Sequence, residues 1–261
     1  MKYPGGKGGA GVYQTIINLI PPHRLYIEAF AGGANIYERK APAATSYLIE
    51  RCPKQATILR STIAELGGIP AESDAIVIND DAVRVLRAWP WVGDEFVYLD
   101  PPYVLDTRTK KSIYAHEMTD DEHRELLAVL ALLPPGVKFM LSGYHNAIYD
   151  EVASKQGWRR VDFQAMTRGG VRTESVWMNY EAPAVIADYA YVGKDFRERE
   201  RIKRKVRRWV RRLQQLPAIE RAALLSAMRD PEVAMLASPA TSGDATRCAS
   251  SVAINSDVVP V

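Results

Sequence analysis

Residues 25–35 read Leu-Tyr-Ile-Glu-Ala-Phe-Ala-Gly-Gly-Ala-Asn, an apolar run that passes directly into a glycine turn. The run predicts a buried strand, and Gly32 and Gly33 predict a tight turn at its end. Three further apolar runs end on, or shortly before, an acid: residues 45–49, 75–78 and 95–99, followed by Glu50, Asp81 and Asp100. Ligands of open parallel sheets bind at the carboxyl ends of the strands, so these residues are expected to meet at one edge.

Helical segments are predicted between these strands. Thr119 and Glu122 have the spacing of a capping box and begin a helix that runs to Leu133. The other predicted helices cover residues 11–20, 56–66 and 147–155, and the later strands cover residues 137–141, 158–163 and 175–180, the last two as an antiparallel pair. Strands that alternate with helices predict an α/β domain around a mostly parallel sheet.

The charge of the chain is concentrated in one segment near its end. Residues 194–212 hold eleven basic and three acidic residues, a net of +8 within a chain whose total is +3. Apolar residues recur there at steps of three and four, which predicts an amphipathic helix. The basic face favours a polyanionic partner such as nucleic acid, although a solvated helix face is the alternative. We therefore divide the chain into a domain at 1–181, a basic helical extension at 182–236, and a disordered tail at 237–261.

Several classes of protein are excluded by composition. The two cysteines cannot build a disulfide scaffold, so a reducing cytoplasm is the expected setting. The longest apolar run, residues 126–133, falls short of the roughly 20 residues of a membrane span, and residues 1–10 lack the apolar region of a signal peptide. The four histidines lack the spacing of a metal site, so no metal is expected.

Asp100-Pro101-Pro102-Tyr103 is the sharpest chemical signal in the sequence. Two prolines force a rigid, extended turn, which holds a carboxylate, a carbonyl oxygen and an aromatic ring in fixed positions. The Asp100 carboxylate and the Pro101 carbonyl can accept the two N–H bonds of an exocyclic amine and direct its lone pair at an electrophile. Tyr103 provides a ring on which an unstacked base can lie. A plain Pro-Pro turn is the alternative.

The two glycine segments predict a nucleoside site. An acid about 20 residues beyond a glycine turn suits the hydroxyls of a ribose, and Glu50 occupies that place behind Gly33. The full G-x-G-x-x-G pattern is missing, which favours a nucleoside without phosphates. The loop at residues 3–7 allows Tyr3 and Lys7 to reach a cofactor. A ligand-free turn and a flexible leader are the respective alternatives.

Three segments, in this order, resemble the Dam-type (D12 class) DNA adenine-N6 methyltransferases. They are Lys2-Tyr3-Pro4-Gly5-Gly6-Lys7, Glu28-Ala29-Phe30-Ala31-Gly32-Gly33-Ala34 and Asp100-Pro101-Pro102-Tyr103. The resemblance covers residues 1–181, and residues 172–179 are similar to a late strand of phage-type members. It implies a Rossmann-like fold with helices on both faces of the sheet and an antiparallel late strand. It also implies S-adenosylmethionine as the methyl donor, and a bacterial or phage-infected cell as the setting.

The resemblance also implies roles for individual residues. Asp100 is expected to touch both the cofactor and the target amine, Glu50 the ribose, and Asp81 the region of the cofactor adenine. The remaining cofactor contacts implied are Tyr3, Lys7, Glu28, Phe30, Gly32 and Gly33, and the catalytic segment is Asp100, Pro101, Pro102 and Tyr103. The adenine is expected to flip out of the duplex onto Tyr103 and to attack the sulfonium methyl group in line.

This chain departs from the family at several positions. Alanine stands at position 29 where proline is usual, Ala34 replaces a glycine-like position, and Glu50 replaces an aspartate. The segment between Ala34 and Asp100 is also too short for the usual target-recognition domain. Sequence specificity must then come from elsewhere in the chain, be relaxed, or depend on a partner. The candidates for DNA contact are Arg108, Lys110 and Lys111 after the catalytic turn and Arg204 and Arg208 in the basic segment. A solvated basic loop is the alternative for the first group.

The predicted function is methyl transfer from S-adenosylmethionine to the N6 amine of adenine in double-stranded DNA. Methylation of cytosine N4 or of RNA adenine is the nearest alternative, although Asp100 favours DNA adenine within the family. A catalytically silent nucleic-acid-binding protein is a second alternative, which the complete Asp100-to-Tyr103 motif disfavours. A small-molecule methyltransferase does not explain the basic segment. The recognition sequence, the oligomeric state and a restriction partner are left open.

Overall fold

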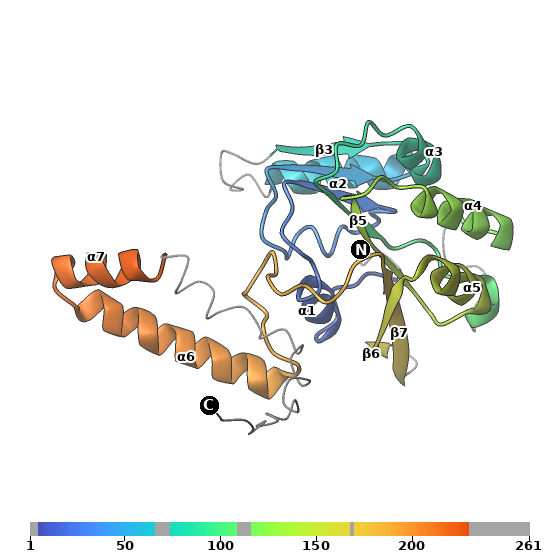
Figure 1. Cartoon of the computed structure of the whole chain (residues 1–261). Helices are drawn as coiled ribbons and strands as arrows, with labels where there is room; N and C mark the ends of the chain where they lie inside the picture. Colours follow the sequence, from blue (N-terminus) through green and yellow to red (C-terminus); the bar gives the residue numbers. More distant parts are fainter. Residues whose placement is uncertain (1–4, 66–73, 109–115, 168–169, 230–261) are drawn as a thin grey trace, which may run out of the picture. The chain divides into compact units, whose positions relative to one another are not determined.

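The structure is a computed structural model that describes residues 5–65, 74–108, 116–167 and 170–229. Its centre is a β-sheet (Figure 1). The sheet has seven strands in the order β3-β2-β1-β4-β5-β7-β6. The strands are β1 (Leu25–Ala29), β2 (Thr45–Ile49), β3 (Asp74–Ile78), β4 (Glu95–Leu99), β5 (Lys138–Gly143), β6 (Arg159–Thr167) and β7 (Gly170–Met178). The first five run parallel, and β7 is antiparallel to both β5 and β6. The mostly parallel sheet with an antiparallel late strand is confirmed.

Helices cover both faces of this sheet. The α-helices in the described part of the chain are α1 (Val12–Ile17), α2 (Pro53–Glu65), α3 (Ala82–Arg87), α4 (Asp120–Ala131), α5 (Ala147–Gln156), α6 (Phe196–Gln215) and α7 (Ala218–Ala227). Apolar side chains of α3, α4 and α5 pack into one buried cluster, while those of α1 and α2 pack into a second one. The predicted capping box of α4 is present, since Thr119 and Glu122 each accept the other's backbone N–H.

The strand register explains why the site forms where it does. The last residues of β1, β2, β3 and β4 lie level with one another, as Ala29 pairs with both Ile49 and Leu99, and Ile49 with Ile78. The residues that follow these ends are therefore brought side by side. The strand order also reverses between β1 and β4, because the chain builds outward to β3 and then returns to the other side of β1. Such a reversal point opens a crevice at the carboxyl ends of the strands.

The largest differences from the sequence-based prediction are a missed helix and a longer hairpin. Helix α3 was not predicted, because six residues hold too little periodicity to identify a helix. Strands β6 and β7 are longer than expected toward their shared turn, since β6 continues to Thr167 and β7 begins at Gly170. Polar residues in this extension, such as Gln164 and Thr173, interrupt the apolar pattern on which the prediction depended.

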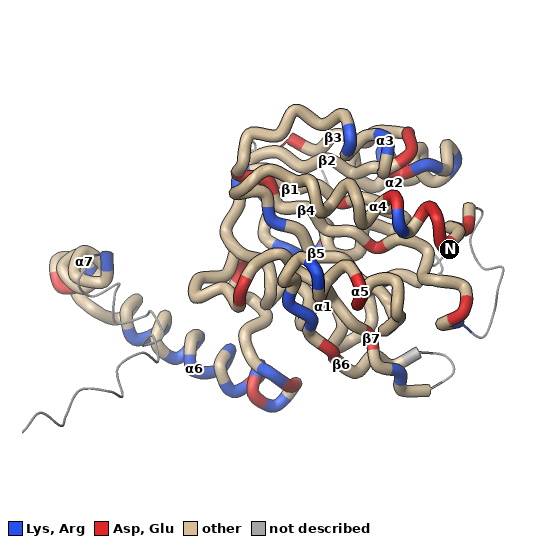
Figure 2. Tube along the Cα trace, turned by 45° about the vertical axis from the view of Figure 1, so that its right-hand side comes forward, with Lys and Arg blue, Asp and Glu red and all other residues tan. Residues whose placement is uncertain are grey.

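The basic segment forms helix α6 as predicted (Figure 2). Its acids lie in the first turns, where Glu198 pairs with Arg201 and Glu200 with Lys203. The cations beyond them have no acid on the helix to offset their charge. By compactness, the described residues up to Gln215 form one unit and those from Leu216 onward form another. The predicted tail at 237–261 lies outside the described residues, and the proposed domain boundary at 181/182 stays a prediction. No helix among the described residues is long and apolar enough to cross a membrane.

A buried histidine makes the stability of the fold sensitive to acid. His123 in α4 is 0% exposed, and its Nδ1 lies 2.9 Å from the Tyr149 hydroxyl. Burial lowers the pKa of His123 from 6.5 to about 4. The unfolded chain then binds the proton more readily between these two values, so His123 costs stability as the pH falls through that window.

We expect His123→Gln to remove this contribution. Between pH 7.5 and pH 5 the free energy of unfolding of the wild type should fall by about 2 kcal/mol more than that of the variant. Urea titrations at both pH values measure the difference. Comparing the two proteins cancels the opposing contribution of Glu28, whose pKa burial raises to about 7. An identical pH dependence in both proteins would contradict the assignment.

Candidate active site

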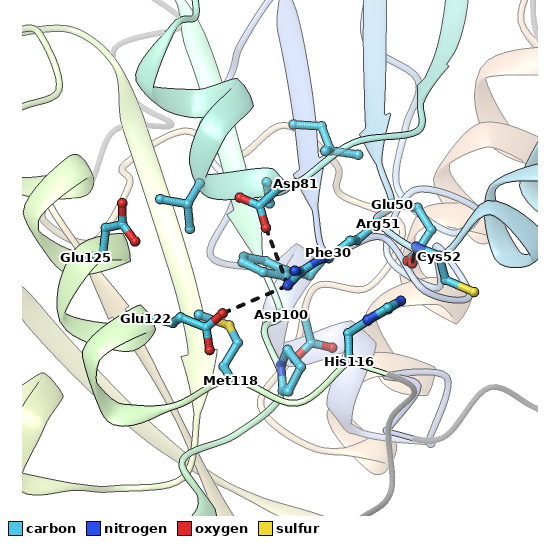
Figure 3. A pocket seen from close by; sticks show the side chains of 14 residues that line it. Phe30, Glu50, Arg51, Cys52, Asp81, Asp100, His116, Met118, Glu122 and Glu125 are labelled. Carbon is cyan, nitrogen blue, oxygen red and sulfur yellow. Dashed lines mark hydrogen bonds and ion pairs between the residues drawn. The ribbon is translucent and has the colours of Figure 1, made fainter.

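Two adjoining cavities lie at the carboxyl ends of the strands, and Phe30 and Asp100 line both of them. The larger cavity is also lined by Glu50, Asp81, Glu122 and Met118, which come from separate elements (Figure 3). The smaller cavity is bordered by the glycine turn and by Lys7. The structure thus brings together Glu50, Asp81, Asp100 and the glycine turn.

Glu50 holds the glycine turn against the end of β2. Its Oε2 accepts a hydrogen bond from the Gly32 N–H at 2.9 Å, and its Oε1 accepts one from the Cys52 N–H at 2.7 Å. The side chain is buried yet lines the larger cavity. A carboxylate has about four lone-pair sites, so each oxygen can accept a further hydrogen bond from a ligand. Two such acceptor oxygens suit the two hydroxyls of a ribose, and the ribose contact of Glu50 stays a prediction.

The glycine turn stores backbone strain. Phe30 has φ 61°, Gly32 has φ 51° and Ala34 has φ 46°, all in the left-handed region. Glycine adopts this region freely, whereas a non-glycine residue there costs on the order of 1 kcal/mol. Strain of this kind is often found at ligand-binding sites. Here it directs the Phe30 ring into both cavities.

Glu28, at the fourth position of β1, has a structural role beside its place in the smaller cavity. Its Oε2 accepts hydrogen bonds from the Tyr26 hydroxyl and the Tyr37 N–H, each at 2.8 Å. Burial raises the pKa of Glu28 to about 7, while these two hydrogen bonds oppose the shift. The cofactor contact predicted for Glu28 stays a prediction.

Lys7 and Asp100 form a pair that the sequence did not reveal. The Lys7 Nζ donates to Asp100 Oδ1 at 2.7 Å and to Oδ2 at 2.9 Å, and it lies 4.8 Å from the centroid of the Tyr103 ring. The Lys7 side chain is 5% exposed and that of Asp100 is 19% exposed. Burial raises the pKa of Asp100, and the charge of Lys7 opposes this shift. A carboxylate whose pKa is raised is a stronger hydrogen-bond acceptor.

Tyr103 is held by residues on the other side of the site. Its hydroxyl donates to Glu174 Oε2 at 3.3 Å, and its ring meets that of Tyr144 edge to face at 4.7 Å. The ring is only 7% exposed, so a base can lie on it only if Lys7 yields its place. Sequence reasoning assigned no role to Glu174 or Tyr144. Glu174 lies in β7 and Tyr144 directly follows β5, and no local motif marks either residue.

Arg51 spans the larger cavity and was also not predicted. Its Nη1 lies 3.7 Å from Asp81 Oδ2 and 3.9 Å from Glu122 Oε1 (Figure 3). Asp81 is the N-cap of α3 and accepts a hydrogen bond from the Arg84 N–H. Glu122 belongs to the capping box of α4. Carboxylates at the starts of α3 and α4 therefore both face the guanidinium of Arg51. Arg51 is the residue that directly follows Glu50 in the sequence.

The residues predicted to contact DNA lie in different surroundings. Arg108 is paired with Glu117 at 2.6 Å and its side chain is 5% exposed, so a phosphate could reach it only if that pair opened. Arg204 and Arg208 lie exposed on α6. Three predicted site residues fall outside the described residues: Tyr3, Lys110 and Lys111.

The chemistry of the larger cavity suits a positively charged nucleoside. Phe30, Ile49, Val83 and Met118 provide apolar contacts for a base. Carboxylates outnumber cations in the lining, which favours a ligand with a sulfonium and an ammonium group. No cluster of three or more His, Cys, Asp or Glu side chains that could hold a metal occurs in the described part of the chain.

Residues 71–167 match the family model described as D12 class N6 adenine-specific DNA methyltransferase. This match confirms the predicted resemblance. No curated protein was found to match the sequence of the chain. The D12 class methyltransferases use S-adenosylmethionine, and the residues of the larger cavity fit that cofactor. The chain is accordingly assigned as an S-adenosylmethionine-dependent methyltransferase with a Rossmann-like fold.

Solved structures similar to this methyltransferase include the following three. TrmK of M. capricolum, in complex with S-adenosylhomocysteine, is 7% identical, with 87% of this chain and 97% of that chain covered and a TM-score of 0.45. Precorrin 8W decarboxylase of Methanobacterium thermoautotrophicum is 12% identical, with 67% and 91% covered and a TM-score of 0.44. TYW2 of P. horikoshii, in complex with MeSAdo, is 14% identical, with 68% and 64% covered and a TM-score of 0.43.

Proposed function

We propose that this methyltransferase modifies the N6 amine of adenine in double-stranded DNA after the base has flipped out of the helix. The observation that carries the proposal is the position of the Lys7 nitrogen. It donates to both oxygens of Asp100 and lies over the Tyr103 ring, as the amine of a base stacked on Tyr103 would. The site thus already binds one nitrogen donor in the manner required for the target amine.

The side chains around this position have separable tasks. Asp100 accepts an N–H of the amine and localises the lone pair on nitrogen. Tyr103, held by Glu174 and Tyr144, supports the base, and Lys7 yields its place when the base enters. The rigid Asp100-to-Tyr103 turn keeps carboxylate and ring in register with one another.

The cofactor is proposed to lie in the larger cavity. Glu50 accepts hydrogen bonds from the ribose, Asp81 lies beside the adenine, and Phe30 with Gly32 borders the end nearest Asp100. When bound, S-adenosylmethionine supplies a sulfonium methyl group that an amine lone pair can attack, with the thioether of S-adenosylhomocysteine as the leaving group. Asp100 lines both cavities and so faces the donor and the acceptor of that group.

The identity of the methylated base is the direct test. Plasmid DNA and RNA, both prepared without methylation, are incubated with the protein and S-adenosylmethionine, digested to nucleosides and analysed by mass spectrometry. N6-methyladenine in DNA alone is the expected product. N4-methylcytosine, or methylation of RNA alone, would assign the site to another amine. Cofactor binding without any methylated nucleoside would instead favour a silent binding protein.

Helix α6 is proposed to contact the DNA backbone through Arg204 and Arg208. Each phosphate contact contributes about 0.9 to the slope of log affinity against log salt. The double variant Arg204→Gln/Arg208→Gln should therefore reduce that slope by about 1.8, measured by fluorescence anisotropy on a duplex. Arg60→Gln/Arg124→Gln, which removes two exposed cations from other helices, is the matched control. Equal slopes for the α6 variant and the control would contradict the contact.

A further inference from the structure

The β6–β7 hairpin extends well beyond the sheet to which it belongs. The two strands pair with each other from Arg159–Met178 to Thr167–Gly170. Within β7, however, only residues 175–178 pair with β5. Residues 163–167 and 170–174 therefore form a two-stranded ribbon that overhangs the edge of β5.

One face of this ribbon is packed against the body. Ala165 is 2% exposed, and Phe163 packs on the same buried cluster as α1. Glu174 lies on this face and accepts the hydrogen bond from the Tyr103 hydroxyl. Arg172, on the same face, has its guanidinium 5.7 Å from the Tyr144 ring. The inner face is thus fastened to the residues that hold the catalytic Tyr103.

The other face of the ribbon is exposed. Met166 and Val171 are direct cross-strand partners, and their side chains are 71% and 59% exposed. The next pair on this face is Gln164 and Thr173, in which the Gln164 amide donates to the Thr173 hydroxyl at 3.0 Å. An apolar pair and a polar pair therefore stand side by side in water. An exposed apolar pair of this kind is typical of a binding surface.

We propose that this outer face is the target-recognition surface of the methyltransferase and that it enters the major groove beside the flipped adenine. The proposal rests on the DNA substrate proposed above. The major groove admits a two-stranded ribbon, and other β-ribbon proteins bind there. Gln164 and Thr173 can hydrogen-bond to base edges, while Met166 and Val171 suit the methyl group of thymine. The link from Glu174 to Tyr103 places the ribbon next to the target base, so DNA is the partner that meets this face.

A recognition surface on the ribbon also accounts for the lack of room for a recognition domain between Ala34 and Asp100. The four outer side chains are uncharged, so they contribute selectivity between bases rather than general attraction to phosphates. Cations elsewhere in the chain provide the general attraction to phosphates. Selectivity and affinity should then respond to different substitutions.

The test compares two ribbon variants with a control. The variants are Gln164→Ala/Thr173→Ala and Met166→Ala/Val171→Ala. Val92→Ala/Leu132→Ala removes two apolar side chains that are 75% and 84% exposed elsewhere on the surface. Long-read sequencing of methylated genomic DNA defines the preferred site of the wild type. Methylation rates are then measured on that site and on sites with one neighbouring base pair changed.

The ribbon variants are expected to reduce the preference for the wild-type site by at least about fivefold, which corresponds to the loss of one good base contact. Their affinity for S-adenosylhomocysteine should stay within twofold of the wild type, and the control should keep the full preference. Unchanged preference in both ribbon variants would overturn the inference while leaving adenine methylation intact. The same holds if the wild type methylates adenine without any site preference. A wild type that methylates no adenine would overturn the proposed function and this inference together.

Discussion

Asp100→Asn is expected to lower kcat for adenine methylation by about a thousandfold, because the amide cannot offer the charged acceptor that localises the lone pair of the target amine. Asparagine keeps the shape of the side chain, so the substitution tests the charge alone. The variant should still bind S-adenosylhomocysteine within about tenfold of the wild type, since Glu50 and the apolar lining are untouched. Incorporation of labelled methyl groups into DNA measures the rate, and calorimetry measures the binding.

The Asp100 variant also has a predicted effect on folding. Removing the carboxylate leaves the Lys7 ammonium, which is 5% exposed, with Glu174 at 3.9 Å as its nearest acid. We expect a loss of about 1–3 kcal/mol in the free energy of unfolding. Asp106→Asn is the matched control, because Asp106 is an exposed acid six residues further along. An Asp100→Asn protein that methylates DNA at a near-normal rate would remove Asp100 from the mechanism.

Glu50→Gln is expected to weaken the binding of S-adenosylhomocysteine by about 10- to 100-fold. Both carboxylate oxygens of Glu50 accept backbone N–H bonds, from Gly32 and from Cys52. An amide has only one oxygen, so its NH₂ group would face one of these N–H donors and loosen the glycine turn. A lost hydrogen bond to a charged group is worth about 1.5–3 kcal/mol, which corresponds to that range of affinity.

Calorimetry of S-adenosylhomocysteine binding measures this effect directly and does not depend on turnover. Glu65→Gln, at the exposed end of α2, provides the control. If Glu50 contacts the ribose, the wild type should bind adenosine more tightly than 2′-deoxyadenosine when each is added as a competitor. The variant should discriminate poorly between these two competitors. If Glu50→Gln binds within twofold of the wild type, Glu50 neither contacts the cofactor nor supports a turn on which cofactor binding depends.

Local sequence was sufficient for the elements with a strong local signal. The four strands before Phe30, Glu50, Asp81 and Asp100 are apolar runs with polar ends, and the capping box at Thr119 determines where α4 begins. Elements whose pattern is weak were missed or shortened. Helix α3 has only six residues. The overhanging part of the β6–β7 hairpin carries both exposed apolar and exposed polar side chains on its outer face, so it lacks a buried apolar run.

The residues of the site divide in the same way, into those with a local sequence signal and those without one. Motifs identified Glu50, Asp81 and Asp100, because acids at strand ends are visible in the sequence. Contacts between distant segments were not visible. Lys7 and Asp100 are 93 residues apart, and Tyr103 and Glu174 are 71 residues apart. The burial of Arg108 against Glu117 likewise could not be foreseen from a loop that reads as basic and exposed.

The sequence by itself determined the order of the strands along the chain, the acids at their ends and the basic helix, since each depends on neighbouring residues. The tertiary structure alone decided which of these residues meet. Parallel pairing in level register placed the ends of β1, β2 and β4 in one row and so assembled the cavity. It also decided that Lys7 occupies the place proposed for the target amine and that one face of the β6–β7 ribbon is left uncovered beside it. These outcomes depend on sheet geometry and packing between remote segments, which no local pattern encodes.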